Sequence, residues 1–188
     1  MVTYISPHYK NSDFPSGISL DQKIDIFSDQ VIGWQLDIAQ QCVDKIPNSG
    51  FAVLHIIFSY FEMIAKSIDG YNGKNRSREY FKKGFIYVFK DVVKKDPEIN
   101  DPNILEKVIY SVYDNVRCGL YHIGMTEANV KISLDYKYPI YYIIKLKELQ
   151  INHSILIKTM LQHFNSYIVQ LRDPQNIDLR KNFNRHFQ

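Results

Sequence analysis

Cysteine and other metal-binding residues are scarce in this sequence. The two cysteines in its 188 residues, Cys42 and Cys118, do not have the spacing of a metal-binding pair. His153 and His163 are ten residues apart, which does not suit two ligands on one helical turn, so we interpret them as surface or packing residues. We therefore expect no metal site and no cofactor. So few cysteines are also typical of a reducing compartment, and we expect a cytoplasmic protein.

Long apolar runs and a strong charge of one sign are also missing. The longest apolar stretch, residues 51–65, is interrupted by His55 and Glu62 and is shorter than a bilayer span. Residues 1–15 lack the apolar segment of a secretory leader, so we expect no leader and no membrane association. The net charge of +3 permits a nucleic-acid partner without indicating one. Phosphate-loop, dinucleotide-binding, serine-nucleophile and zinc-protease signatures are absent as well.

Apolar and aromatic residues are abundant. Hydrophobic residues make up 45% of the chain, with 14 tyrosines and 11 phenylalanines, which is enough for the core of one ordinary domain. We expect this domain to span residues 19–171. Residues 1–18 contain prolines, a glycine and polar residues and are predicted to form an extended N-terminal arm. Residues 172–188 are polar and basic and are predicted to form a loose C-terminal tail.

Helical spacing of apolar residues extends over most of this domain. Ser19 and Gln22 form a capping-box pattern at the start of a first helix. Its predicted apolar face comprises Ile24, Phe27, Val31, Trp34 and Ile38. A second helix over residues 51–68 is apolar nearly all round, so it should be central, and it should end at Asp69–Gly70.

Three further helices are predicted from their start and stop signals. Ser77 begins the third helix and Pro97 ends it; Asp101–Pro102 begins the fourth, which should end near Arg117; and Asn152 begins the last. Between the fourth and last helices the apolar period changes to two, which predicts a β-hairpin over about residues 129–147. The predicted fold is therefore mainly α, an up-down bundle of about five helices with a short hairpin before the last helix.

The segment around the end of the fourth helix combines two chemically active side chains. Arg117 offers a planar set of donors that suits phosphate oxygens, and His122 can carry a proton near neutral pH. Gly119 and Gly124 bracket the histidine and are expected to loosen the helix and leave room for a ligand. An arginine and a histidine in this arrangement can move a phosphoryl group without a metal.

This Arg-x4-His pattern, at the end of a later helix of a helical bundle, resembles the HEPN family. Many members are metal-independent ribonucleases of toxin–antitoxin and antiviral systems. The resemblance implies a homodimer that brings two Arg117–His122 pairs into one cleft. One His122 would act as base and the other as acid in the attack of a ribose 2′-hydroxyl on the adjacent phosphate. Arg117 would stabilise the developing charge, and single-stranded RNA would be the substrate.

The residue that follows the arginine departs from the pattern of active family members, which usually have Asn, Asp or His there. This chain has Cys118. A catalytically inactive module of the same shape, which dimerises or binds RNA or a nucleotide, is therefore the alternative. A helical scaffold that acts through protein contacts is the third. If the protein is a toxin, an antitoxin or another regulatory protein would be a further partner.

Three residues are candidates to support the motif. Glu62 lies in the most apolar helix and needs a partner, which is either Arg117 or Lys66, one turn further on. Asp114 precedes Arg117 by three residues and could form a local ion pair with it. Tyr121 could stack on a base, although such a tyrosine is also common in a core or an interface.

A basic stretch precedes and enters the third predicted helix. It consists of Lys74, Arg76, Arg78, Lys82 and Lys83. Cations at the start of a helix oppose its dipole, which suggests that they bind an RNA backbone. The alternative is an ordinary solvated helix start.

Overall fold

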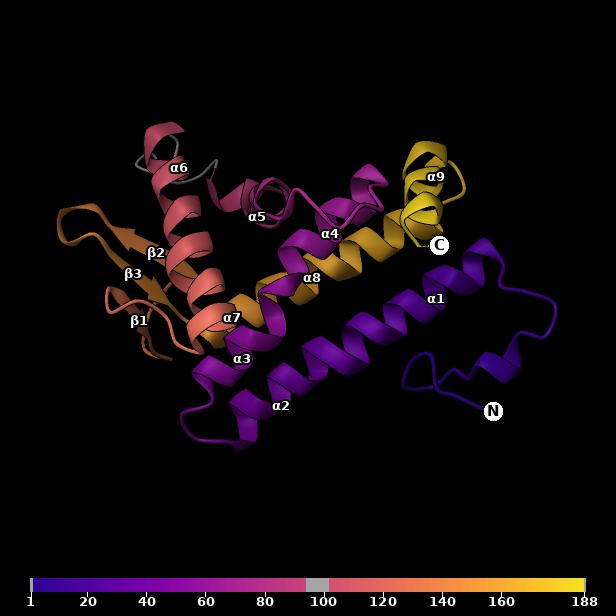
Figure 1. Ribbon diagram of the computed structural model, residues 1–188, viewed down its shortest axis with the longest axis horizontal. Helices are drawn as coiled ribbons and strands as arrows, with labels where there is room; N and C mark the ends of the chain where they lie inside the picture. Colours follow the sequence, from indigo (N-terminus) through magenta and orange to yellow (C-terminus); the bar gives the residue numbers. More distant parts are fainter. Residues whose placement is uncertain (1, 94–101, 188) are drawn as a thin grey trace.

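The computed structural model describes residues 2–93 and 102–187, and over these residues the fold is mainly α, as predicted. Helices stack along the long helix α8 (His153–Arg172), and a small sheet lies at one end of the molecule, at the left of Figure 1. The predicted helix boundaries at Pro97 and Asp101 lie outside the described residues. The arm contains one short 3-10 turn, η1 (Asn11–Asp13).

The first long helix begins at the predicted capping box. The Ser19 Oγ atom accepts a hydrogen bond from the backbone N–H of Gln22, and the Gln22 side chain accepts one from the backbone N–H of Ser19. The helix then continues through three segments without a break: α1 (Leu20–Val31), the π-helical η2 (Ile32–Leu36) and α2 (Asp37–Lys45).

The π-helical segment changes which residues of this helix face the core. Trp34 and Ile38 were predicted on the apolar face, but they are 49% and 44% exposed. Leu36 and Ala39 are fully buried in their place. A π-turn takes about one residue more than an α-turn, so the buried stripe steps from Val31 to Leu36, and the helix beyond it is rotated relative to a regular α-helix.

Helices α3 (Gly50–Ile57) and α4 (Ser59–Asp69) form the centre of the molecule, and α4 ends at Gly70 in the left-handed conformation, as predicted. Within the described residues, Gly50–Asp69 is long and apolar enough to cross a membrane by length and composition alone, and half of it is buried inside the protein. The core helix of a soluble protein passes the same test, so this is weak evidence for a membrane span.

Helix α5 (Ser77–Val93) packs very closely against α4. A Cβ atom at Gly84 would lie 1.7 Å from the carbonyl oxygen of Phe61, so only glycine permits this approach of the two backbones. Three aromatic rings of α5, Phe81, Phe85 and Phe89, then contact the Phe61 ring. This contact fixes the middle of α5 against α4.

The next helix is longer than predicted. It runs through α6 (Pro102–Tyr110), the π-helical η3 (Ser111–Cys118) and α7 (Gly119–Ile123), whereas the sequence predicted an end near Arg117. Gly124 has a φ of 78° and ends the helix in the left-handed conformation. The whole Arg-x4-His segment is therefore helical.

The sheet has three strands, β1 (Val130–Ile132), β2 (Ile140–Ile143) and β3 (Glu148–Ile151), with a short 3-10 turn, η4 (Ile144–Leu146), between the last two. The predicted pairing of the first two strands is wrong. Strand β3 lies between them, antiparallel to β2 and parallel to β1. Lys147, with a φ of 49°, turns the chain so that β3 returns beside β2.

The C-terminal residues form a helix, α9 (Ile177–His186), instead of the predicted loose tail. Phe183 is fully buried, and its ring lies 5.3 Å from that of Phe27. The Arg185 guanidinium donates to the backbone carbonyls of Gly70 and Asp69, at 2.7 and 2.9 Å, and so binds the C-terminal end of α4. Leu179 and Phe187 also pack against the core, so a few apolar side chains anchor this mainly polar segment.

The N-terminal arm lies along α1. The Ser6 hydroxyl and the His8 backbone N–H both donate to Asp29, at 2.6 and 2.8 Å, and Pro7 packs beside Gly33. Partial burial raises the pKa of Asp29, but the hydrogen bonds from Ser6 and His8 outweigh this effect and leave the pKa below its ordinary value.

Candidate functional site

Arg117 lies at the end of η3, with its side chain turned into the protein. Its guanidinium lies over the rings of Tyr113 and Tyr121, 5.5 and 4.9 Å from their centroids. Its Nη2 atom donates to the Ser77 hydroxyl at 3.2 Å and lies 3.6 Å from a carboxylate oxygen of Glu62. The Arg117 side chain is 23% exposed. Arg117 therefore connects α4, α5 and η3 and still reaches solvent.

Both partners predicted for Glu62 are present. Lys66 donates to its carboxylate at 2.7 Å, Arg117 lies nearby, and the Ser77 hydroxyl donates to the second oxygen. Partial burial raises the pKa of Glu62, but these hydrogen bonds and the charges of Lys66 and Arg117 outweigh it, so the pKa lies below its ordinary value. Glu62 is therefore ionised at neutral pH and balances part of the charge of Arg117.

His122 lies in the last turn of α7, and its side chain is exposed. It has no hydrogen bond or ion pair with any residue that the structure describes, Arg117 included. In a regular α-helix the two residues would point about 140° apart, and the chain does remain helical between them. The chain thus directs Arg117 inward and His122 outward, and no described contact brings them together.

The two glycines do not loosen the helix, contrary to the prediction. Gly119 is buried, and a Cβ atom there would lie 2.5 Å from the carbonyl oxygen of Met125. It therefore allows the chain after α7 to return against the helix, and that chain fills the space predicted for a ligand. Gly124 serves as the C-cap of α7. Cys118 is a free, half-buried thiol.

Asp114 and Tyr121 contact partners that the sequence did not predict. Asp114 forms an ion pair with Arg78 of α5 instead of Arg117, because Arg117 turns toward Glu62. The Tyr121 hydroxyl donates to the backbone carbonyl of His55 at 3.4 Å, and the ring is 48% exposed. The Tyr121 ring therefore contacts the Arg117 guanidinium and is also partly exposed to solvent.

Arginines and tyrosines alternate across the surface at this point. The Arg78 guanidinium lies 5.2 Å from the centroid of the Tyr110 ring and 5.5 Å from that of Tyr113. Tyr113 also contacts Arg117, which contacts Tyr121. We call these five residues the Arg–Tyr row. Sequence reasoning missed Tyr110 and Tyr113, although their spacing from Arg117 and Tyr121 is that of one helix face.

The basic stretch is largely paired with carboxylates. Arg76 pairs with Glu79, Arg78 with Asp114, Lys82 with Glu106 and Lys83 with Asp69. Lys74 is exposed and has no ion pair or hydrogen bond with the described part of the chain.

An open groove lies beside the Arg–Tyr row. Its volume is about 880 Å³, and it separates the start of α5 from α6. Arg76, Arg78 and Lys82 line it together with Tyr110 and Tyr113. Three residues of the predicted RNA-binding set therefore meet two unpredicted tyrosines at one groove.

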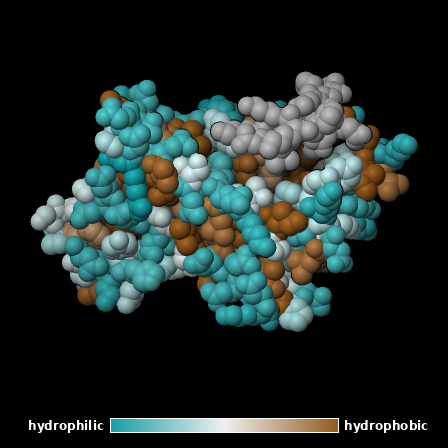
Figure 2. Space-filling view, turned by 180° about the vertical axis from the view of Figure 1, so that it is seen from behind, coloured by the Kyte–Doolittle hydropathy of each residue, from teal (hydrophilic) through white to brown (hydrophobic). Residues whose placement is uncertain are grey.

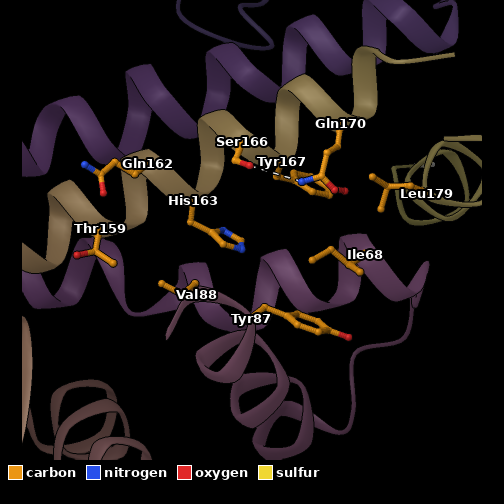
Figure 3. Close-up of a pocket in the computed structure, with 10 residues that line it drawn as sticks. All are labelled: Ile68, Tyr87, Val88, Thr159, Gln162, His163, Ser166, Tyr167, Gln170 and Leu179. Carbon is orange, nitrogen blue, oxygen red and sulfur yellow. Dashed lines mark hydrogen bonds between the residues drawn. The ribbon is translucent and has the colours of Figure 1, made fainter. Parts of the chain in front are cut away.

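A second groove, of about 450 Å³, lies between α4, α5, α8 and α9 (Figure 3), and none of the predicted site residues lines it. Among its described lining residues there is no lysine, arginine, aspartate or glutamate. Two of them are engaged with buried groups behind the groove: His163 Nδ1 lies 2.8 Å from the Tyr60 hydroxyl, and the Tyr167 hydroxyl lies 2.8 Å from that of Ser67. We interpret this surface as a product of core packing.

Comparisons of the chain with models of known protein families, with curated proteins and with solved structures found no match. Among the residues described, no group of three or more His, Cys, Asp or Glu side chains is placed to hold a metal ion.

Proposed function

We propose that this protein is a HEPN-like domain that binds single-stranded RNA along the Arg–Tyr row. The observation that carries this proposal is the alternation of arginine guanidinium groups with tyrosine rings beside an open groove. Bases of single-stranded RNA stack on aromatic rings and guanidinium planes, and positive side chains follow the phosphates. Tyr110 and Tyr121, at the two ends of the row, are 57% and 48% exposed and are available for stacking.

The charge balance of the row favours stacking over strong phosphate binding. Arg78 and Arg117 each lie beside a carboxylate, Asp114 and Glu62 respectively. An RNA phosphate must share these arginines with the carboxylates, so each contributes less than an unpaired cation. Exposed ion pairs are weak and exchange partners readily. We expect moderate affinity that falls as the salt concentration rises.

The test is the binding of a fluorescent single-stranded oligouridine, measured by fluorescence anisotropy. Tyr110→Ala should weaken binding about 5-fold to 100-fold, because stacking contributes about 1–3 kcal/mol per base. Tyr138→Ala is the matched control, since Tyr138 is 46% exposed but lies beside the sheet. Equal losses in the two variants, or no binding by the parent protein, would refute the proposal.

Metal-independent cleavage of the bound RNA is a second candidate function, favoured by the surroundings of His122. This imidazole, which has no partner within residues 2–93 and 102–187, is flanked by exposed apolar side chains: Tyr121, Ile123 and Met125 are 48%, 69% and 55% exposed. Apolar side chains also reach the surface in patches on the face shown in Figure 2. A second copy of the chain that covers the end of α7 would bury these side chains and bring two His122 residues together. One imidazole would then act as base and the other as acid.

Arg117 enters this reaction only by exchanging partners. It would stabilise the charged transition state if a phosphate oxygen replaced Glu62 beside its guanidinium. The dimer would supply the second imidazole. It would also have to bring the groups together, since Arg117 and His122 of one chain do not converge. A regulatory protein that binds the same apolar surface would block both the dimer and the reaction.

Dimerisation and cleavage are tested with separate variants. Ile123→Asp should convert a dimer to a monomer in analytical ultracentrifugation, whereas Val169→Asp should not, although both parent residues are 69% exposed. RNA cleavage in EDTA should disappear in His122→Ala and persist in His8→Ala, which removes an exposed histidine of the arm. Cleavage by the Ile123→Asp monomer at the parent rate would exclude the shared mechanism.

A further inference from the structure

A separate pocket lies at the end of the molecule that carries the sheet (Figure 1). Its volume is about 490 Å³, and it is enclosed by the loop between α2 and α3, the start of α3, the chain after β1 and the start of α8. Much of its wall is apolar, and three of the apolar side chains reach solvent: Ile46, Phe51 and Leu134 are 54%, 37% and 54% exposed. Such walls suit a small hydrocarbon group.

The start of α3 supplies hydrogen-bond donors to this pocket. The first N–H groups of a helix have no acceptor within the helix and carry its positive dipole end. The N-cap residue Ser49 does not satisfy them, since its hydroxyl donates to the backbone carbonyl of Cys42 at 2.9 Å. Gly50 and Phe51, the first residues of the helix, both line the pocket.

A buried histidine faces the same space. His153 lines the pocket and is only 6% exposed, and its Nδ1 atom is fully buried without a hydrogen-bond partner among the residues described. Burial lowers the pKa of His153, so the imidazole is neutral at physiological pH. A neutral imidazole can carry its proton on Nδ1 and donate it to an acceptor in the pocket. An unsatisfied buried polar atom is unfavourable unless a ligand satisfies it.

Gly50 brings the start of α3 close to this imidazole. A Cβ atom at position 50 would lie 2.8 Å from the Ile132 side chain and 3.6 Å from His153 Nδ1. The Ile132 side chain fills the space beside Gly50, so only glycine permits this close approach. The helix start and the imidazole therefore lie near one another at the same end of the pocket.

We propose that this pocket binds a small monocarboxylate with a short hydrocarbon tail. The carboxylate accepts hydrogen bonds from the start of α3 and from His153 Nδ1, and the tail packs on Ile46, Phe51 and Leu134. The described residues of the lining include no lysine or arginine. They do include the exposed Asp135. This side-chain charge disfavours a phosphate dianion, whereas the positive dipole end of α3 favours a singly charged acceptor over a neutral one.

Nuclear magnetic resonance of histidine-labelled full-length protein tests the proposal. Hexanoate is the probe, compared with hexan-1-ol, hexylamine and hexyl phosphate, which share its tail and differ in the polar group. Hexanoate should shift the His153 ring resonances in a saturable manner. It should also bind more tightly than each of the other three compounds. The His122 resonances, which belong to an exposed residue in another helix, serve as the internal control.

Three surface variants keep the test independent of folding, because His153 itself is buried and its replacement can unfold the protein. Asp135→Asn should tighten hexanoate binding roughly 2-fold to 5-fold by removing a nearby negative charge, whereas Asp178→Asn on α9 should have no effect. Leu134→Ala should weaken binding about 3-fold through loss of apolar contact. Preference for hexylamine, weaker binding in Asp135→Asn, or no shift of the His153 resonances by hexanoate would overturn the proposal.

Discussion

Replacement of Glu62 by glutamine should lower the free energy of unfolding by about 2 kcal/mol at neutral pH. Glutamine keeps the size of the side chain but removes the charge. Lys66, whose side chain is only 12% exposed, then loses its counter-ion at 2.7 Å, and Arg117 loses one at 3.6 Å. A hydrogen bond to a charged group contributes about 1.5–3 kcal/mol, and the 20% exposure of the Glu62 side chain reduces that value.

The contribution of Glu62 should depend on pH with a definite sign. Because its pKa is lower in the folded protein than the ordinary value of 4.5, the stabilisation is fully present above pH 4.5. It is lost as the pH falls below that value through the lowered pKa. The difference in unfolding free energy between the parent protein and Glu62→Gln should therefore be constant near neutrality and shrink in acid.

Urea denaturation followed by circular dichroism measures this difference at each pH. Glu106→Gln is the matched control, because the Glu106 side chain is 73% exposed and lies 3.4 Å from Lys82. That change should alter the free energy of unfolding by less than about 0.5 kcal/mol. Equal effects of the two substitutions, or a Glu62→Gln effect that persists unchanged in acid, would refute the reasoning.

The same substitution should act oppositely on RNA binding. Without Glu62 beside it, Arg117 has more of its charge available for a phosphate, so Glu62→Gln should bind oligouridine about 2-fold to 5-fold more tightly than the parent protein. A variant that is less stable and binds more tightly would separate this effect from general damage to the fold. Weaker binding in Glu62→Gln would indicate that the row needs the carboxylate to hold Arg117 in place.

Three further substitutions test the packing. Phe183→Ala should lower the free energy of unfolding by about 3–5 kcal/mol in urea denaturation, because it empties a fully buried position; a change below 1 kcal/mol would mean that α9 does not fold onto the core. Gly84→Ala should greatly reduce the yield of folded protein, since its Cβ would overlap the Phe61 carbonyl, and normal stability would contradict the contact between α4 and α5. Gly33→Ala should displace Pro7, 2.6 Å from the new Cβ, and expose the arm to limited proteolysis while the melting temperature of the helices stays within a few degrees.

Local signals in the sequence predicted the helix starts well. The capping box at Ser19 and Gln22, the Asn152 cap and the stop at Gly70 each depend on a few neighbouring residues, and the structure confirms all three. The phase of the first helix failed beyond Val31 because a π-turn leaves no clear mark in the spacing of apolar residues. The three-stranded sheet and α9 depend on distant partners, which periodicity does not reveal.

The sequence predicted the candidate site only in part. The sequence predicted a cationic partner for Glu62, because a carboxylate in an apolar helix needs one, and both alternatives, Lys66 and Arg117, lie beside it. The predicted pairing of Asp114 with Arg117 is wrong, because Arg117 turns toward Glu62 of α4 and Asp114 pairs with Arg78 of α5. Tyr110 and Tyr113 were missed because aromatic residues at helical spacing are more often part of a core.

The contact between Phe27 and Phe183 also has a consequence for synthesis of the protein. Helix α1 emerges from the ribosome well before α9, which carries the Phe183 ring that covers Phe27. A nascent chain halted before residue 177 would leave this apolar surface open, and chaperones recognise such surfaces. Emergence of α9, rather than completion of the central helices, would then be the step that closes this part of the core.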